Sequence, residues 1–374
     1  MAFVKQNKDL IACATLIGVI FALPHVISFL SLDNYAAFVS PIQGNAANAE
    51  SFYASNVRDV VDGYYTATDS NLYEHKLDLN PFHIAPVILM GLIAKFVGVS
   101  NAFVLADFVF PALAFLLLFA LAYAATGNKL LSTTAGVLAL AANDLLIKFP
   151  PITVLPEFIK TLLLTEPRMP LASFSLTPYP QIPFVLLLAG LLFYYKAVVE
   201  GKKWFYAPAA ITYGLSFYTY LYAWTFFTAF LGLYWLALLF TKNKAHKQVL
   251  LTAAAGGVMA LPYLIALIQF QQTPVALDVL RRAGIEFGRQ VQWLQTIKFL
   301  AILAFFAFTV KHDKRFYFFT TAIAAGLVGL NSQVLTGRMI LIDHYLVLVL
   351  TPLMVIVGAI IASEWLKHNK LKSS

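Results

Sequence analysis

Long apolar runs, separated by short polar segments, make up most of the chain. Eleven runs are long enough, or nearly long enough, to form membrane-spanning helices: 10–32, 83–98, 102–126, 130–148, 181–199, 204–221, 222–241, 249–271, 293–310, 316–331 and 340–366. Because a full crossing takes about 20 apolar residues, the shorter runs 83–98 and 316–331 would have to tilt, kink or extend into flanking polar residues. The pattern predicts an all-α polytopic membrane protein with about 10–12 spans, forming a single transmembrane domain over residues 1–374.

Lysines in the polar segments predict how the chain is oriented. They gather at 5–8, 202–203, 242–247, 311–315 and 367–372. Cytoplasmic loops carry an excess of lysine and arginine, so these segments and both termini are expected in the cytoplasm. The segments expected on the other side are 33–82, 149–180, 272–292 and 332–339. Eleven crossings cannot leave both termini on one side, which leaves the number of crossings between residues 83 and 180 open.

Composition agrees with an integral, multi-pass membrane protein. Hydrophobic residues make up 60% of the chain and charged residues 12%, whereas soluble domains contain about 25% charged residues. The net charge of +8 comes from lysines at helix ends rather than from one patch, which argues against a nucleic-acid partner. The single cysteine, Cys13, excludes an intrachain disulfide and favours a prokaryotic plasma membrane over the endoplasmic reticulum.

The longest polar segment between two apolar runs lies within the first external loop, 33–82, and holds six carboxylates between Glu50 and Asp78. Wound as a helix, its first half places one stripe of residues on a single face: Glu50, Ala54, Arg58 and Asp62. Apolar residues occupy the other sides, as in an amphipathic helix lying at a membrane surface. Gly63 is a plausible stop for this helix.

Acids and arginines are both sorted to the external side. On the predicted topology, twelve of the eighteen acids and six of the seven arginines are external, Arg315 being the exception. The planar guanidinium suits bidentate binding of phosphate or carboxylate. The alternative is that these arginines pair with the external acids or with lipid headgroups.

The chain carries four short patterns: Glu50-x-x-Tyr53-x(4)-Arg58-x(4)-Gly63, then Pro81-Phe82-His83, then the aromatic run 213–224, then Asn331-Ser332-Gln333-x(2)-Thr336-Gly337 with Asp343-His344. Together with the layout of the spans, these patterns resemble the GT-C glycosyltransferases. The likeness covers most of the chain loosely and is to layouts such as oligosaccharyltransferase, protein mannosyltransferase and aminoarabinose transferase. Many members carry two adjacent acids or Asp-x-Asp in this loop. This chain has Glu50 alone, followed by Asp59 and Asp62.

The resemblance implies inverting transfer of a sugar from a polyprenyl-phosphate-linked donor to an acceptor hydroxyl on the non-cytoplasmic face. A carboxylate must accept the acceptor's proton, and Glu50, Asp59 and Asp62 are the candidates. Their alternative role is a solvated helix face neutralised by Arg58. A divalent cation, Mg²⁺ or Mn²⁺, is left open, because the spacing of His75 and His83 near these acids is not diagnostic of a metal site.

Cations are needed to stabilise the departing phosphate. The candidates are Arg58, Arg168, Arg338 and His344. The alternative for Arg168 is an ion pair that braces its loop. The alternative for Arg338 and His344 is a hydrogen bond at a helix end. Tyr53, Tyr218 and Tyr222 are candidates for binding the sugar or the prenyl chain, although the aromatic run 213–224 also fits an interfacial belt. Arginines of 272–292 could bind donor or anionic lipid equally well.

Two other functions are consistent with the sequence. A transporter or flippase of an anionic lipid or solute would use the intramembrane acids Asp107 and Asp144 together with the external arginines. No inverted repeat or matching pair of broken helices supports it. A non-catalytic subunit with a GT-C-like fold would explain the missing double acid. The expected partners are the lipid-linked donor and membrane lipids, with the oligomeric state left open.

Overall fold

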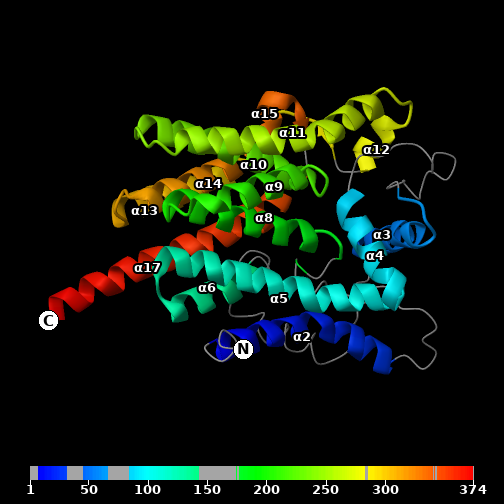
Figure 1. The fold of residues 1–374 in the computed structure, drawn as a ribbon, viewed down its shortest axis with the longest axis horizontal. Coiled ribbons are helices and arrows are strands. Elements are labelled where there is room, and N and C mark those ends of the chain that lie inside the picture. Colours follow the sequence, from blue (N-terminus) through cyan, green and yellow to red (C-terminus); the bar gives the residue numbers. More distant parts are fainter. Residues whose placement is uncertain are drawn as a thin grey trace. The chain divides into compact units, whose positions relative to one another are not determined.

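The computed structural model describes residues 7–31, 45–65, 84–142, 174, 177–282, 285–339, 341 and 343–373. Helices make up nearly all of this part of the chain (Figure 1). Two compact units are present. The first unit comprises Met1–Leu116 and Leu140–Val185, and the second unit comprises Leu117–Ala139 and Leu186–Ser374.

The first unit contains α2 (Lys8–Ser31), α3 (Asn45–Val61), α4 (Ile84–Val97) and the beginning of α5 (Val99–Thr126). Gly18 brings α2 close to α5, because a Cβ at this position would lie 2.6 Å from the carbonyl oxygen of Phe108. Small residues allow such close approach of helices in membranes. The beginning of α8 (Gln181–Tyr194) also belongs to this unit.

The second unit holds the rest of α5 and α8 and, apart from the last three residues of α6, all the remaining elements. They are α6 (Lys129–Ala142), η3 (Tyr195–Val199), η4 (Lys203–Phe205), α9 (Tyr206–Ser216), α10 (Leu221–Phe240), α11 (His246–Gln271), α12 (Ala276–Arg282), α13 (Trp293–Thr309), α14 (Lys314–Leu330), α15 (Ser332–Thr336), α16 (Asp343–Tyr345), η5 (Leu346–Leu350) and α17 (Thr351–Ser373). Two short strands, β1 (Glu286–Phe287) and β2 (Arg338–Met339), pair antiparallel.

The core of the second unit is aromatic. Helix α10 packs along α14, and α9 packs along α11 (Figure 1). Phe230 lies 5.3 Å from both Tyr234 on its own helix and Phe318 on α14, measured between ring centroids. Edge-to-face and stacked pairs of this kind contribute about 0.5–1.5 kcal/mol each beyond their burial. Burial of these rings fixes the register between α10 and α14.

Among the described residues, five helices are long and apolar enough to cross a membrane: Val99–Thr126, Gln181–Val199, Leu221–Phe240, His246–Gln271 and Leu346–Asn369. Three shorter apolar helices accompany them, Ile84–Val97, Lys129–Ala141 and Trp293–Thr309. These helices confirm the prediction of an all-α membrane protein. The number of crossings and the side on which each loop lies stay predictions.

One predicted span differs from its helix. The run 204–221 contains α9, whose 11 residues extend only about 17 Å at 1.5 Å per residue. The chain then turns through 217–220 before α10 begins. In this turn the hydroxyl of Ser216 donates to the carbonyl of Tyr213 at 2.6 Å, and that of Thr219 donates to Ser216 at 2.9 Å. Side-chain hydroxyls that compete for backbone carbonyls favour such breaks.

Candidate functional site

Helix α3 carries the predicted acidic site. It covers Asn45–Val61 and ends before Gly63, whose φ of +99° is a left-handed conformation that suits glycine. The amide of Tyr64 donates to the carbonyl of Asp59 at 2.8 Å and closes the last turn. The predicted helix and its stop therefore lie where the sequence places them.

The apolar face of α3 packs on α4. Val57 and Val60 are fully buried. A Cβ added at Gly91 of α4 would lie 2.3 Å from Cγ1 of Val60, so only glycine allows this approach. Beyond the helix, Lys95 of α4 donates to the hydroxyl of Tyr65 at 2.8 Å. These contacts hold the C-terminal part of α3 against α4.

The polar face of α3 is exposed. Nε of Arg58 donates to Oδ2 of Asp62 at 3.0 Å, and the two side chains are 64% and 45% exposed. An exposed pair of this kind contributes about 0.3–0.5 kcal/mol. Asp59 is half-buried and makes a contact of its own. Glu50 belongs to the second turn of the helix, and its side chain lies outside the described residues.

Helical spacing separates the three candidate carboxylates. Glu50 precedes Asp59 by nine residues and Asp62 by twelve, which corresponds to about 13 and 18 Å along the axis. Glu50 therefore cannot share a reacting atom with either aspartate. Glu50 on the one hand, and Asp59 with Asp62 on the other, are therefore alternative positions for the base.

Tyr53 also lies on α3. Its ring lies 4.9 Å from that of Tyr179, tilted by 46°, in the turn that precedes α8. Burial raises the pKa of Tyr53 to about 12. Tyr53 therefore stays protonated at neutral pH, and it can stack or donate a hydrogen bond but cannot serve as a base.

A buried polar cluster lies inside the first unit. The carboxylate of Asp107 on α5 is bound by Nε2 of His25 on α2, by the hydroxyl of Thr177 and by the side-chain amide of Gln181. The amide of Gln181 also donates to the carbonyl of Phe174 at 2.7 Å. Asp107 is 3% exposed. With these partners, the buried acid ties α2, α5 and the start of α8 together.

The sequence marks Asp107 as an intramembrane acid but does not identify its partners. His25 is the one histidine of the first apolar run, and Gln181 opens a span. For His25 and Gln181 alike, the sign of a buried polar contact in the sequence is a polar residue within an apolar run. Asp144, the other intramembrane acid, lies outside the described residues.

In the second unit, His344 meets two tyrosines of the aromatic run. The hydroxyl of Tyr220 lies 2.9 Å from Nδ1 of His344, and the ring of Tyr222 stacks on the imidazole at 4.4 Å. Next to them the hydroxyls of Thr225 and Tyr345 lie 2.7 Å apart. Contacts with two tyrosines fix the orientation of the His344 imidazole. The tyrosines and the histidine are more than a hundred positions apart in the sequence.

The remaining candidates are placed differently. The guanidinium of Arg338 lies 4.9 Å from the ring centroid of Phe287 on the paired strand, and Arg338 is exposed. The hydroxyl of Tyr218 donates to the carbonyl of Met259 on α11 at 2.8 Å, so Tyr218 faces α11 rather than His344. Arg168, His75 and His83 lie outside the described residues.

The structure thus brings the candidates together as two groups. Tyr53, Arg58, Asp59 and Asp62 accompany Glu50 on and beside α3 in the first unit, and Tyr222 accompanies His344 in the second unit. Among the described residues, no three His, Cys, Asp or Glu side chains gather to hold a metal ion. No family model matches the chain, and no curated protein matches it either.

Proposed function

We propose that the protein is a GT-C-type membrane glycosyltransferase that uses a polyprenyl-phosphate-linked sugar donor at the non-cytoplasmic face. One observation carries this proposal. An amphipathic helix, α3, follows the first apolar helix, packs its apolar face on α4 and leaves a polar face with Arg58 and Asp62 exposed. A carboxylate-bearing helix held at a membrane surface suits an acceptor hydroxyl that must meet a lipid-linked donor.

The reaction is a single displacement. The acceptor hydroxyl gives its proton to a carboxylate, and its oxygen forms a bond to the anomeric carbon. The bond from this carbon to the donor phosphate breaks, and polyprenyl phosphate leaves with the electron pair. Configuration is inverted. Because phosphate is a good leaving group, nearby cations can replace a general acid.

Glu50 is the proposed base. The carboxylate of Asp62 is already engaged, because it accepts a hydrogen bond from Arg58. Asp59 is half-buried at the C-terminal end of the helix, where the helix dipole disfavours a carboxylate. Glu50 lies in the second turn of α3, about 12 Å along the axis before Arg58, and it is the acid that opens the pattern shared with the GT-C glycosyltransferases.

The donor phosphate is assigned to the basic residues. Arg58 binds Asp62 through Nε, and a guanidinium has further N–H donors on its terminal nitrogens that suit phosphate oxygens. Within the second unit, His344, oriented by Tyr220 and Tyr222, and Arg338 on β2 are proposed as further candidates for binding the donor phosphate or the start of the prenyl chain. Arg168 is retained as a further candidate from its sequence alone.

A transfer assay tests the proposal. Protein reconstituted in liposomes is incubated with radiolabelled polyprenyl-phosphate hexoses and an acceptor-containing membrane extract. The Glu50→Gln variant is expected to lose transfer by about 10²- to 10⁴-fold. Glu200→Gln is the matched control, because Glu200 pairs with Lys202 at 2.6 Å, in a segment predicted to be cytoplasmic, and has no role in the proposed transfer. Full activity in Glu50→Gln, Asp59→Asn and Asp62→Asn alike would exclude the mechanism.

The transporter alternative loses one of its supports. Asp107 is buried and satisfied by three side chains, as expected of a structural tie rather than of a site that releases its ligand in each transport cycle. The non-catalytic alternative is distinguished by the same assay. A pure protein that binds the donor but transfers no sugar would support it.

A further inference from the structure

A cavity of about 290 Å³ lies in the second unit, between the end of α10 and the beginning of α14. Its lining includes Tyr234, Asn243, His312, Lys314 and Tyr317. The two chain segments that frame it, 242–247 and 311–315, are lysine-rich and are therefore predicted to be cytoplasmic. The cavity takes no part in the proposed transfer reaction.

Hydrogen-bond donors dominate this lining. Tyr234 is completely buried, and its hydroxyl has no hydrogen-bond partner among the described residues. Buried hydroxyls are nearly always satisfied, so this one is a donor that remains available to a ligand in the cavity. Oδ1 of Asn243 accepts from the amide of Ala245 at 3.0 Å, so its side-chain nitrogen is the group that can donate. Lys314 is exposed and makes no ion pair within the described chain.

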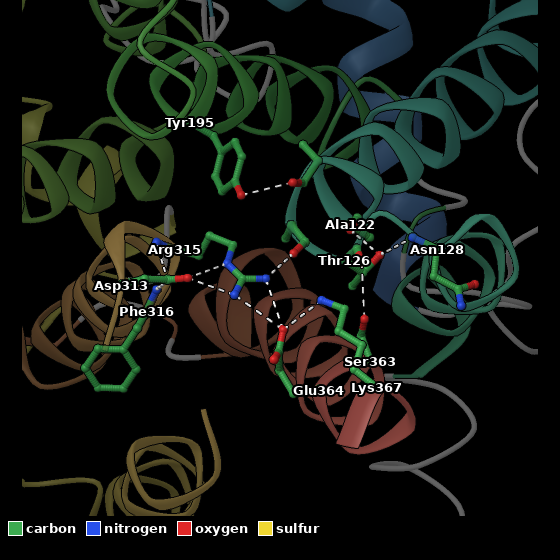
Figure 2. Close-up of polar contacts among 12 residues, drawn as sticks. Ala122, Thr126, Asn128, Tyr195, Asp313, Arg315, Phe316, Ser363, Glu364 and Lys367 are labelled. Carbon is green, nitrogen blue, oxygen red and sulfur yellow. Dashed lines mark hydrogen bonds and ion pairs between the residues drawn. The ribbon is translucent and has the colours of Figure 1, made fainter. Parts of the chain in front are cut away.

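The one carboxylate at the cavity is already neutralised. Asp313 binds Nε of Arg315 at 2.9 Å and its terminal nitrogen at 2.8 Å, and it also caps α14 through the amides of Arg315 and Phe316. Figure 2 shows the Arg315 guanidinium between Asp313 and Glu364. Because Asp313 is engaged in this way, the charge that remains at the cavity is positive.

Apolar side chains flank the cavity in sequence. Phe240, next to the end of α10, is 81% exposed, and Phe308, one turn before His312, is 90% exposed. Phenylalanine is apolar throughout, so exposed rings at these positions of a membrane protein suit contact with acyl chains. A ligand with a charged headgroup and acyl chains would match the polar cavity and this apolar flank together.

We propose that the cavity binds the phosphate of an anionic phospholipid from the leaflet on the lysine-rich side. Lys314 supplies the countercharge. The Tyr234 hydroxyl and the Asn243 amide donate hydrogen bonds to the phosphate or to the polar headgroup atoms. The exposed aromatic rings accommodate the acyl chains.

Native mass spectrometry of the full-length protein tests this assignment. The protein is titrated with phosphatidylglycerol and with phosphatidylcholine of the same acyl chains. The variants are Lys314→Gln and Tyr234→Phe. The matched control is Lys298→Gln, which makes the same charge change on α13, at a lysine that does not line the cavity.

The wild type is expected to bind one phosphatidylglycerol more tightly than phosphatidylcholine. Lys314→Gln should weaken this binding about tenfold, as expected for losing a charged hydrogen bond, and Lys298→Gln should leave it unchanged. Tyr234→Phe should weaken it severalfold without lowering the unfolding temperature of the lipid-free protein, because the hydroxyl makes no hydrogen bond within the described chain. If Tyr234 had a purely structural role, Tyr234→Phe would lower the unfolding temperature of the lipid-free protein together with the affinity for the lipid.

Three results would overturn the proposal. The first is equal affinity for the two lipids. The second is equal binding by Lys314→Gln and Lys298→Gln. The third is saturable binding of inorganic phosphate or glycerol phosphate that displaces no lipid, which would assign the cavity to a soluble phosphate instead.

Discussion

Nε of Arg58 donates a hydrogen bond to Oδ2 of Asp62 at 3.0 Å, across one turn at the end of α3. This contact engages one of the three candidate carboxylates and aligns a cation with the same face of the helix. We therefore assign different roles to the carboxylates of the acidic segment. Asp62 orients Arg58, and Glu50, about 18 Å away along the axis, is left as the proposed base.

Asp62→Asn should accordingly change transfer much less than Glu50→Gln does. The asparagine keeps a side-chain oxygen that can accept from Arg58, so we expect a loss below about tenfold, seen mainly in the KM for the donor. Steady-state kinetics with the radiolabelled donor measures this. If Asp62→Asn instead abolishes kcat while Glu50→Gln retains it, Asp62 is the base and the assignment is wrong.

Replacing Gly91 should loosen α3 from α4. A Cβ there would meet Cγ1 of Val60 at 2.3 Å, and overpacking of this kind costs about 1–3 kcal/mol. Gly91→Ala should lower the unfolding temperature in detergent and speed proteolysis within α3. Val60→Ala in the same chain should recover part of the loss.

Gly232→Ala is the control for Gly91, because nothing lies within 4 Å of a Cβ at that position. Alanine stabilises helices relative to glycine, so this control should be neutral or slightly stabilising. Equal destabilisation by the two glycine substitutions would show that the close contact on α4 is not the cause.

Removing the carboxylate of Asp107 should destabilise the first unit strongly. Asp107→Ala leaves His25, Thr177 and Gln181 without their shared acceptor, and breaking a buried pair on one side costs about 3–5 kcal/mol. Chemical unfolding monitored in detergent should show this loss. Asp278→Asn, at an exposed position of α12, should stay within about 0.5 kcal/mol of the wild type. A similarly small effect of Asp107→Ala would mean that the cluster does not tie the helices.

The ion pair at Asp313 predicts a pH dependence of stability. Partial burial alone would raise the pKa of Asp313, but hydrogen bonds from Arg315 and from the backbone amide of Phe316 outweigh it and hold the pKa below its ordinary value of 3.8. A carboxyl group whose pKa is lower in the folded than in the unfolded state stabilises the fold at pH values above its unfolded-state pKa. This stabilisation is lost as the pH falls through the folded-state pKa.

Asp313→Asn tests this, because asparagine can still cap α14 but carries no charge. The wild type should be more stable than the variant from neutral pH down to about pH 4. The difference in unfolding temperature should then shrink as the pH drops further. A constant difference across pH 3 to 7 would show that the charge of Asp313 contributes nothing.

The sequence predicted the helices well, because apolar runs of span length and their flanking lysines are local signals. The runs 222–241 and 293–310 correspond closely to α10 and α13. Helix α3 was predicted from i, i+4 spacing and a following glycine, which are local as well. The span predicted over 204–221 is longer than α9, because hydroxyl-to-carbonyl bonds within the aromatic run end the helix at Ser216.

Contacts between distant residues were not predictable in this way. Nothing in the periodicity links Tyr222 to His344 or His25 to Asp107, which only folding brings together. The pairing of Gly91 with Val60 also depends on how two helices pack. The cavity beside Tyr234 is framed by segments far apart in the chain, and one tyrosine among the many aromatic residues of α10 gives no sign of it.

Mass spectrometry of the lipids retained by the gently purified protein tests the central claim most directly. The account predicts a polyprenyl phosphate, bare or carrying a sugar, in addition to bulk phospholipid. Its amount should fall when Arg338 and His344 are both replaced by glutamine. Recovery of bulk phospholipid alone, even after incubation with added polyprenyl-phosphate sugars, would contradict a lipid-linked sugar donor and the proposed transferase with it.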